Sequence, residues 1–364
     1  MSASPDWLFF RSALLAWYRP ERRPMPWKAH PDPYCIWLSE IILQQTRVEQ
    51  GLPYYERFVE AYPTVGDLAA AEDAAVMKLW EGLGYYSRAR NLLKAARYVV
   101  AQYGGEFPAT YEGLLTLPGV GPYTAAAIAS FAFGAQVAVL DGNVFRILAR
   151  FANDATPADT GPGRKHFGAL ASAALGDAAA PLYNQAIMDF GALVCTPRKP
   201  ACPSCPLRTH CRGYALATWP ELPGKTKKMA RRTRYFHYLV ITDRAGNTIV
   251  QQRLEKDIWQ ELFQFPLIET AQAGGQVTDL VHHPDWPGWL PAGELRLEKS
   301  SPPYQQQLTH QTIEAVFHTF TWEQMPKKIS GYALIKNKMF IKFAFPRVIT
   351  RFLADKRLLL DLFS

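Results

Sequence analysis

The spacing of apolar residues predicts two regions of different secondary structure. Up to about residue 215, apolar side chains recur every three or four positions, as in IWLSEIILQQTRVEQGLPYYERFVEAY and DAAVMKLWEGLGYYSRARNLLKAARYVVAQYG, which is the period of amphipathic helices. Gly and Pro interrupt this pattern near Pro53 and Pro108, so short turns should join the helices. We find no pattern typical of strands in this half.

After about residue 235 the period becomes two. YFHYLVITDRAGNTIVQQR predicts two strands joined by a Gly-containing turn, and TIEAVFHTFTWEQ and GYALIKNKMFIKFAF predict further strands, the last with a turn at KNK. VITRFLADKRLLLDLF predicts a closing helix. The fold class is therefore a multidomain chain with an all-α domain (1–218), a linker (219–234) and an α+β domain (235–364).

The predicted linker is basic, with six Lys or Arg among the ten residues from Lys225 to Arg234. Such a run is either a solvated connector or a phosphate-contacting segment. The whole chain has a net charge of +8, which suggests a polyanionic partner such as nucleic acid or an acidic membrane surface. The amino terminus predicts an amphipathic helix closed by Pro20, not a signal peptide, and no apolar run approaches the roughly 20 residues that span a bilayer. We expect a cytoplasmic protein.

Four of the five cysteines lie in one loop, spaced C-x6-C-x2-C-x5-C between Cys195 and Cys211. Disulfides are disfavoured in the cytosol, so the loop predicts a metal site. Structural zinc sites use two close pairs of ligands, whereas only Cys202 and Cys205 form such a pair here. The spacing favours an iron–sulfur cluster, with zinc as the alternative. Cys35 is most simply a small buried hydrophobe.

A glycine turn and two carboxyl groups could also carry chemistry, and each has an ordinary structural interpretation as well. Gly119 and Gly121 form a tight turn before a helix that begins at Pro122, and the free amides of such a helix start can seat a phosphate, although the turn could be simple chain reversal. Glu40 could be an ordinary exposed helix carboxylate. Asp141 could be an N-cap that reaches the amide near Val144 or Phe145.

The motifs together resemble a known superfamily. LPGVGPYTAAAI (within about 113–134), VLDGNVFRILAR and the cysteine loop resemble the helix-hairpin-helix DNA glycosylases. WLSEIILQQTRV, GLGYYSRARNL and YNQAIMDFGALVC narrow the resemblance to the adenine DNA glycosylase, or MutY, family, over residues 25–211. This resemblance implies a base-excision-repair enzyme that removes adenine mispaired with 8-oxoguanine or guanine in duplex DNA. It also implies a monomeric protein that, as in bacteria, lies in the cytoplasm and associates with the nucleoid. The resemblance further implies that Cys195, Cys202, Cys205 and Cys211 bind a [4Fe–4S] cluster.

The resemblance assigns roles to individual residues. It implies that Glu40 protonates adenine N7 as a general acid and that its apolar neighbours favour its protonated form. It implies that Asp141 stabilises the sugar cation or bonds to it, with Asn143 and Tyr123 orienting the pair. Relatives that also cleave the strand have a lysine where Tyr123 stands, so no efficient lyase step is expected.

Other positions match contacts of the family with DNA and with the flipped base. Gln45 and Tyr85 match wedges in the duplex, and Thr46 and Leu83 match contacts to the oxidised guanine. Beside the basic composition, the turn at Gly119 and Gly121 is itself a candidate for a sequence-independent contact with the DNA backbone. The expected adenine pocket consists of Met25, Trp27, Lys28, Val48, Gln185 and Met188. For the apolar members, core packing is an equally good interpretation.

The second domain resembles the Nudix-like domain with which the family recognises 8-oxoguanine. Leu308, Thr309 and His310 stand where the family has Phe-Ser-His on a recognition loop, and Leu308 cannot stack as an aromatic would. The sequence after IWQELFQFPLIE has no R-E-x2-E-E-type acid cluster, so we expect a binding module and no pyrophosphatase. The alternatives are a non-catalytic iron–sulfur DNA-binding protein, a nucleotide hydrolase, and a glycosylase/lyase for oxidised pyrimidines.

Overall fold

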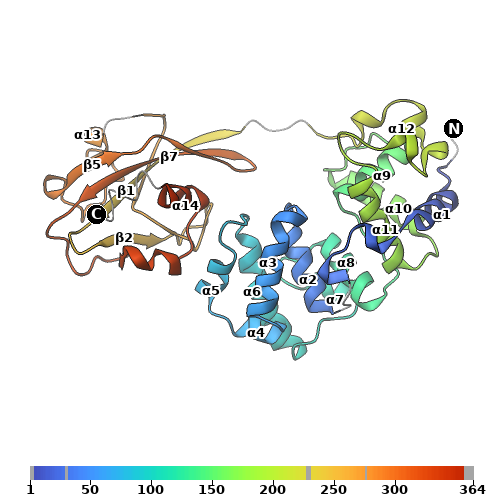
Figure 1. The fold of residues 1–364 in the computed structure, drawn as a ribbon, viewed down its shortest axis with the longest axis horizontal. Coiled ribbons are helices and arrows are strands. Elements are labelled where there is room, and N and C mark those ends of the chain that lie inside the picture. The colour runs from blue at the N-terminus through green and yellow to red at the C-terminus, as the bar shows by residue number, and fades with distance from the viewer. Residues whose placement is uncertain (1–3, 29–31, 227–230, 275–276, 356–364) are drawn as a thin grey trace. The chain divides into compact units, whose positions relative to one another are not determined.

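The computed structural model describes residues 4–28, 32–226, 231–274 and 277–355. The chain forms two compact units (Figure 1). The first, the helical unit, comprises residues 1–70 and 91–228, and the second, the sheet unit, comprises residues 71–90 and 229–364. The segment 71–90 thus groups with the sheet, although its sequence is helical in character. The domain bounds inferred from the sequence stay a prediction.

The helical unit confirms the helical character predicted for this half, and none of its described residues forms a strand. The interruption predicted near Pro53 is wrong, because the helix Val48–Ala61 continues through this proline, and the preceding helix ends at Leu43 instead. Its helices are α1 (Trp7–Trp17), α2 (Pro33–Leu43), α3 (Val48–Ala61), α4 (Val65–Ala70), α7 (Tyr111–Leu115), α8 (Pro122–Phe133), α9 (Gly142–Ala152), α10 (Gly161–Leu175), α11 (Ala180–Leu193), α12 (Arg212–Ala215) and most of α6 (Ser87–Tyr103). Phe10, Phe151 and Phe190 belong to one buried cluster built from α1, α9, α10 and α11. Burial of these apolar faces fixes the helix starts that carry the site below.

The sheet unit is built around one mixed sheet. Its strands are β1 (Arg232–Thr242), β2 (Asn247–Gln252), β3 (Phe263–Gln264), β4 (Leu267–Thr270), β5 (Arg296–Ser300), β6 (Tyr304–Gln307), β7 (Gln311–Thr321) and β8 (Ala333–Lys336). The order is β3-β2-β1-β7-β5, with β4 on β1, β6 on β7 and β8 on β2. The unit also contains α5 (Asp73–Leu79), α13 (Val277–Leu280) and α14 (Arg347–Ala354).

The central pair, β1 and β7, is parallel over its whole length and in register from Arg232↔Gln311 to Thr242↔Thr321. Buried and partly exposed residues alternate along β7, the pattern of a strand with one covered face. Phe317 of β7 stacks on Phe352 of α14 with ring centroids 4.0 Å apart, so this helix covers part of the sheet. The predicted hairpin of β1 and β2 is confirmed, with Gly246 in the left-handed region at its turn.

Two details of the predicted second domain differ. The strand expected after the KNK turn is wrong, because Asn337–Lys342 forms a 3-10 helix. The aromatic side chains of the segment, Phe340 and Phe343, pack against Phe265 and Phe263 instead of extending the sheet. The closing helix ends at Ala354, and the last predicted part of it, 356–364, lies outside the described residues.

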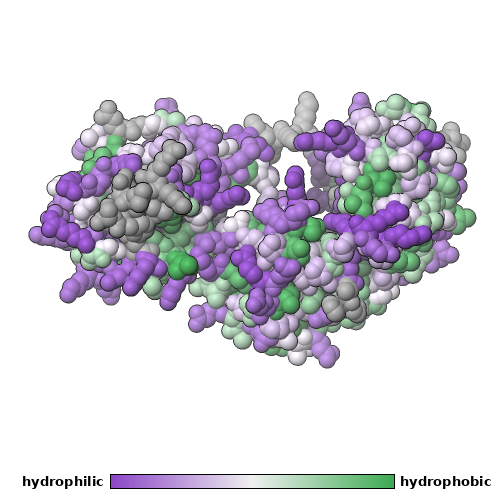
Figure 2. All heavy atoms as spheres, viewed as in Figure 1, coloured by the Kyte–Doolittle hydropathy of each residue, from purple (hydrophilic) through white to green (hydrophobic). Residues whose placement is uncertain are grey.

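Of the basic linker, residues 227–230 lie outside the described ranges. Its last residues belong to β1, where Arg234 forms ion pairs with Asp257 and Glu269. In the described part of the chain, no helix has the length and apolar character needed to cross a membrane. Hydrophilic side chains cover most of the face shown in Figure 2, with smaller apolar patches among them.

Candidate active site

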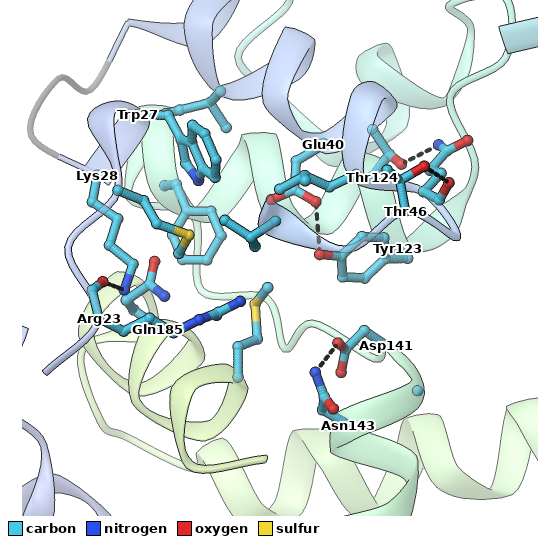
Figure 3. A pocket seen from close by; sticks show the side chains of 18 of the residues that line it. Arg23, Trp27, Lys28, Glu40, Thr46, Tyr123, Thr124, Asp141, Asn143 and Gln185 are labelled. Atoms are coloured by element: carbon cyan, nitrogen blue, oxygen red, sulfur yellow. Dashed lines mark hydrogen bonds between the residues drawn. The ribbon is translucent and has the colours of Figure 1, made fainter. Parts of the chain in front are cut away.

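A cavity of about 1230 Å³ in the helical unit is lined by segments that are far apart in the sequence. It lies among the residues before α2, α2 itself, the starts of α3, α8 and α9, and α11 (Figure 3). The structure brings fourteen predicted site residues to this cavity: Met25, Trp27, Lys28, Glu40, Gln45, Thr46, Val48, Gly119, Gly121, Tyr123, Asp141, Asn143, Gln185 and Met188.

Glu40 is a buried carboxyl group on α2. The helix starts with Pro33 and is capped by Asp32, whose side chain accepts a hydrogen bond from the Tyr34 amide. Glu40 lies in the last turns of this helix, with 7% of its surface exposed. The Tyr123 hydroxyl donates to Glu40 Oε2 at 2.6 Å. Burial raises the pKa of Glu40 to about 7, while the Tyr123 hydrogen bond opposes this rise and the nearby Asp141 charge adds to it. The exposed-carboxylate interpretation is therefore wrong.

Asp141 is the N-cap of α9. Its Oδ1 accepts from the Val144 amide at 2.7 Å, so the N-cap interpretation is confirmed. Its Oδ2 accepts from Asn143 Nδ2 at 3.0 Å. Burial raises the pKa of Asp141, and these hydrogen bonds oppose the rise because they favour the ionised form. One carboxylate thus caps a helix and borders the cavity.

Tyr123 lies in the first turn of α8, after the predicted glycine turn. Gly119 has φ +77°, and a Cβ on it would lie 2.6 Å from the Asn91 Cβ, so the turn requires glycine there. Gly121 is the N-cap of α8, with open space where a Cβ would be. Burial and the neighbouring carboxylates raise the pKa of Tyr123 well above 10, so it remains a neutral hydrogen-bond donor.

A buried arginine that the sequence reasoning missed joins this site to the cysteine loop. Arg146 of α9 donates from Nη2 to Asn143 Oδ1 at 2.8 Å and from Nε to the Cys195 carbonyl at 2.7 Å. Nη2 also donates to the Gly191 carbonyl at 2.7 Å, and a Cβ at Gly191 would lie 2.6 Å from the Asn143 Cβ. Asn143, which bonds Asp141, is therefore fixed from α11 and from the loop.

A second charged group at the cavity was also missed. Asp189 of α11 has a side chain only 2% exposed, and it pairs with Arg23 Nη1 at 3.0 Å and Lys28 Nζ at 2.6 Å. Gln185, one turn earlier, donates to its Oδ1 at 3.3 Å. Burial lowers the pKa of Lys28 despite this partner. The sequence did contain a signal for this residue, because Asp189 lies four positions after Gln185 and therefore on the same face of the helix.

Two predicted DNA wedges have strained backbones, each within its own unit. Gln45 follows α2 with φ 56° and is exposed. Tyr85 follows α5 with φ 50° and is 45% exposed. A left-handed non-glycine residue costs roughly 1–2 kcal/mol, and such strain at the surface is typical of functional positions. Thr46 is adjacent to Gln45 in the sequence. Leu83 is only 4% exposed, and the contact of Leu83 with DNA stays a prediction.

The four loop cysteines line one small cavity together with apolar residues of α9 and α11. Arg150 donates to Cys195 Sγ at 3.5 Å, and its carbonyl accepts from Cys211 Sγ at 3.5 Å. Burial raises the pKa of Cys205 to about 12, so a bound cation would be needed to keep its thiolate. Among the residues that the structure describes, no three His, Cys, Asp or Glu side chains are grouped for a single metal ion. Four thiols around one cavity fit a cluster that takes one cysteine per iron.

The predicted recognition residues form the tip of a hairpin in the sheet unit. Leu308, Thr309 and His310 connect the antiparallel strands β6 and β7, and Thr309 and His310 are exposed. The Thr309 hydroxyl lies 2.8 Å from the Tyr85 hydroxyl, and its carbonyl accepts from Arg231 Nε at 3.3 Å. The structure thus brings Tyr85 to this tip.

Comparison with known proteins agrees with both units. Residues 38–162 match the model of the HhH-GPD superfamily base excision DNA repair protein, and residues 237–355 match the NUDIX domain. An adenine DNA glycosylase of Mus musculus is 45% identical over 231 residues. An adenine DNA glycosylase of Buchnera aphidicola is 34% identical over 265 residues, which are 71% of this chain and 74% of that protein. The chain belongs to the adenine DNA glycosylase family. The resemblance and the fold class predicted from the sequence are thereby confirmed.

The chain matches different fractions of the length of its relatives in the adenine DNA glycosylase family. The match with the Mus musculus protein covers 58% of this chain but only 45% of that protein. Among solved structures, a thermostable thymine-DNA glycosylase is 31% identical with a TM-score of 0.54, over 58% of this chain and 97% of that one.

Proposed function

We propose that the protein is a base-excision-repair glycosylase that hydrolyses the N-glycosidic bond of adenine mispaired with 8-oxoguanine or guanine in duplex DNA. The observation that carries the proposal is the pairing of two carboxyl groups at one cavity. Glu40 is buried with a pKa of about 7, and Asp141 is held by two hydrogen bonds that favour its anion. Two carboxyl groups in different environments can act as acid and as anion in glycoside cleavage.

The first step in this proposal is extrusion of the adenine from the duplex into the cavity, which costs a few kcal/mol. Met25, Trp27, Val48 and Met188 would contact the base, and Lys28 and Gln185, both bonded to the buried Asp189, would border its polar edge. Gln45 would occupy the space left in the stack, and its strained, exposed position favours this role.

In the chemical step, Glu40 gives its proton to adenine N7 while the bond to the sugar breaks and its electron pair goes to the base. The sugar becomes a cation, which Asp141 stabilises or traps as an ester. Asn143 and Tyr123 orient the two carboxyl groups through the bonds described above. A water then adds to the anomeric carbon, displacing the Asp141 carboxylate where the ester has formed, and Glu40, now ionised, accepts the proton of the water. We prefer the ester, which predicts retention at the anomeric carbon.

Strand cleavage through a Schiff base needs an amine at the start of α8. Tyr123 occupies this place, and its hydroxyl is engaged with Glu40. We therefore propose a monofunctional enzyme with no efficient lyase step.

DNA binding would use the free amides at the start of α8, beside Gly119 and Gly121, as a seat for a phosphate. The net charge of +8 favours the same polyanionic partner. On the sheet unit, Tyr85, Thr309 and His310 would face the base opposite the adenine. Leu308 would add apolar contact without stacking.

We also propose that the four loop cysteines hold a [4Fe–4S] cluster. When bound, the cluster would cross-link the loop through its thiolates. The loop in turn fixes the Cys195 carbonyl, which accepts from Arg146 and so supports Asn143.

A single-turnover assay on duplexes with adenine opposite 8-oxoguanine tests the function. Wild-type protein should form abasic sites, and Glu40→Gln and Asp141→Asn should each be slower by at least about 10²-fold, the usual effect of losing an acid or an electrostatic group. Borohydride should trap little cross-linked DNA. Intact strands after alkali treatment, at enzyme excess and with the loop metal present, would contradict the proposal.

A further inference from the structure

The segment 71–90 belongs to the sheet unit, although it lies between two helices of the helical unit in the sequence. It contains α5, a turn that carries Tyr85, and the start of α6. Hydrogen bonds join it to residues after 229 at three places, all within the sheet unit.

The first place is a pair of side chains at the end of α5, which we call the Lys78–Glu81 clip. Glu81 Oε1 accepts from the Phe345 amide at 2.8 Å, and Lys78 Nζ donates to the Phe343 carbonyl at 3.0 Å. Lys78 also donates to Glu81 Oε2. The Lys78 side chain is only 28% exposed and that of Glu81 only 19%, so water cannot readily replace their hydrogen-bond partners.

The segment that the clip holds is itself fixed to the sheet. The Ala344 carbonyl accepts from the Phe263 amide of β3 at 2.8 Å. The Phe343 ring packs on Phe263 with centroids 4.7 Å apart, and Phe345 stacks on Phe265. The clip therefore fastens α5 directly to the sheet through three consecutive residues.

The second place lies after the turn, and the third is the turn itself. Arg90 Nη1 donates to the Gln260 carbonyl at 2.8 Å, and its Nε lies 3.8 Å from Glu261 Oε1. The third is the bond between the hydroxyls of Tyr85 and Thr309. Exposed hydroxyl pairs contribute little on their own, so this third bond depends on the other two.

We propose that Glu81 is a positioning residue for discrimination of the base opposite the adenine. Its bond to the Phe345 amide keeps the Tyr85 turn fixed to the sheet, so that Tyr85 and Thr309 meet this base together. The inference rests on the proposed function, in which these two residues face the base.

The test compares Glu81→Ala with Glu81→Gln and Glu72→Ala in the full-length protein. Glu81→Gln keeps an oxygen that can accept from the Phe345 amide. Glu72→Ala removes the same charge from an exposed side chain one residue before α5. The readouts are hydrogen exchange at the Phe345 amide and the ratio of single-turnover rates on adenine:8-oxoguanine and adenine:guanine duplexes.

Glu81→Ala should speed exchange at Phe345 and lower the rate ratio by about tenfold, the size expected from losing one hydrogen bond to a charged acceptor. Its rate on adenine:guanine should stay within about twofold of wild type, as should all values for Glu81→Gln and Glu72→Ala. Unchanged exchange, or faster exchange with an unchanged ratio, overturns the role of Glu81 alone. If the wild type excises adenine from neither duplex, the proposed function and this role fall together.

Discussion

The hydrogen bond from Tyr123 to Glu40 should set the pH at which the enzyme loses activity. In the proposed mechanism Glu40 must be protonated to act as the acid, and burial raises its pKa to about 7. The protonated fraction is about one half at pH 7 and falls about tenfold for each pH unit well above the pKa, so the single-turnover rate should fall about 50-fold between pH 7 and 9.

Tyr123→Phe removes the hydroxyl and keeps the ring. A hydrogen bond to a charged group at 2.6 Å contributes about 1.5–3 kcal/mol, and here it favours the ionised carboxylate. Its loss should raise the pKa of Glu40 further. Since 1.36 kcal/mol corresponds to one pH unit, the alkaline limb of the pH–rate profile should move upward by roughly one to two pH units.

The assay is a single-turnover profile from pH 5.5 to 9.5 on adenine opposite 8-oxoguanine. Tyr103→Phe is the matched control, because the Tyr103 hydroxyl contacts only the surface residue Thr116 among the contacts described. Its alkaline limb should coincide with that of the wild type. A limb that stays in place in Tyr123→Phe would refute the electrostatic reasoning, as would a wild-type limb near pH 4.5.

Three other outcomes are expected. Asp141→Asn keeps an oxygen that can cap Val144 but loses the charge, so its rate should fall by about 10²–10³-fold with little change in Tm, and a large loss of Tm would contradict this. His237 and His318 are buried, and their ring nitrogens lie 3.0 Å apart. His237 also contacts Thr270, and His318 contacts Ser300. Burial lowers the pKa of both residues, that of His318 to about 4, and His283 lowers the pKa of His237 further. Because the pKa of His318 is lower in the folded state, the unfolded state binds a proton first as the pH falls. The free energy of unfolding, measured by urea titration, should therefore decrease by up to about 3 kcal/mol between about pH 6.5 and 4, and a constant value would contradict this expectation. Purified protein should be brown with about four iron atoms per chain, and Cys202→Ser should lose them; colourless protein with zinc would overturn the cluster.

The proposed reacting groups could be singled out from the sequence because each lies in a short, distinctive stretch, and the structure brings them to one cavity. Glu40 is a carboxyl group in an apolar helix, Asp141 precedes a helix start, and Tyr123 follows a glycine turn. Local pattern determines the starts of α8 and α9, which place Tyr123 and Asp141 at the cavity, and the apolar pattern of α2 buries Glu40 there.

The contacts of the supporting groups could not be predicted, because their partners are distant in the chain; only the position of Asp189, one helical turn after Gln185, had a local signal. Arg146 bonds the Cys195 carbonyl, 49 residues away, and Asp189 pairs with Arg23, 166 residues away. Neither contact has a periodic signal. For the same reason the sequence did not indicate that Glu81 bonds the Phe345 amide, 264 residues away. The strand predicted after the KNK turn failed because aromatic packing outweighed a short alternating pattern.

The parallel register of β1 and β7 has a practical consequence for dissecting the protein. Because Arg232 pairs with Gln311, the first residues of β1 run alongside the recognition tip, and Arg231 bonds the Thr309 carbonyl directly. A version of the sheet unit that retains 71–90 but starts its second segment two or three residues after Arg231 would keep most of β1 and lose the hydrogen bond from Arg231 to the Thr309 carbonyl. If this tip contacts a lesion as proposed, the choice of that first residue alone would change how such a fragment binds it.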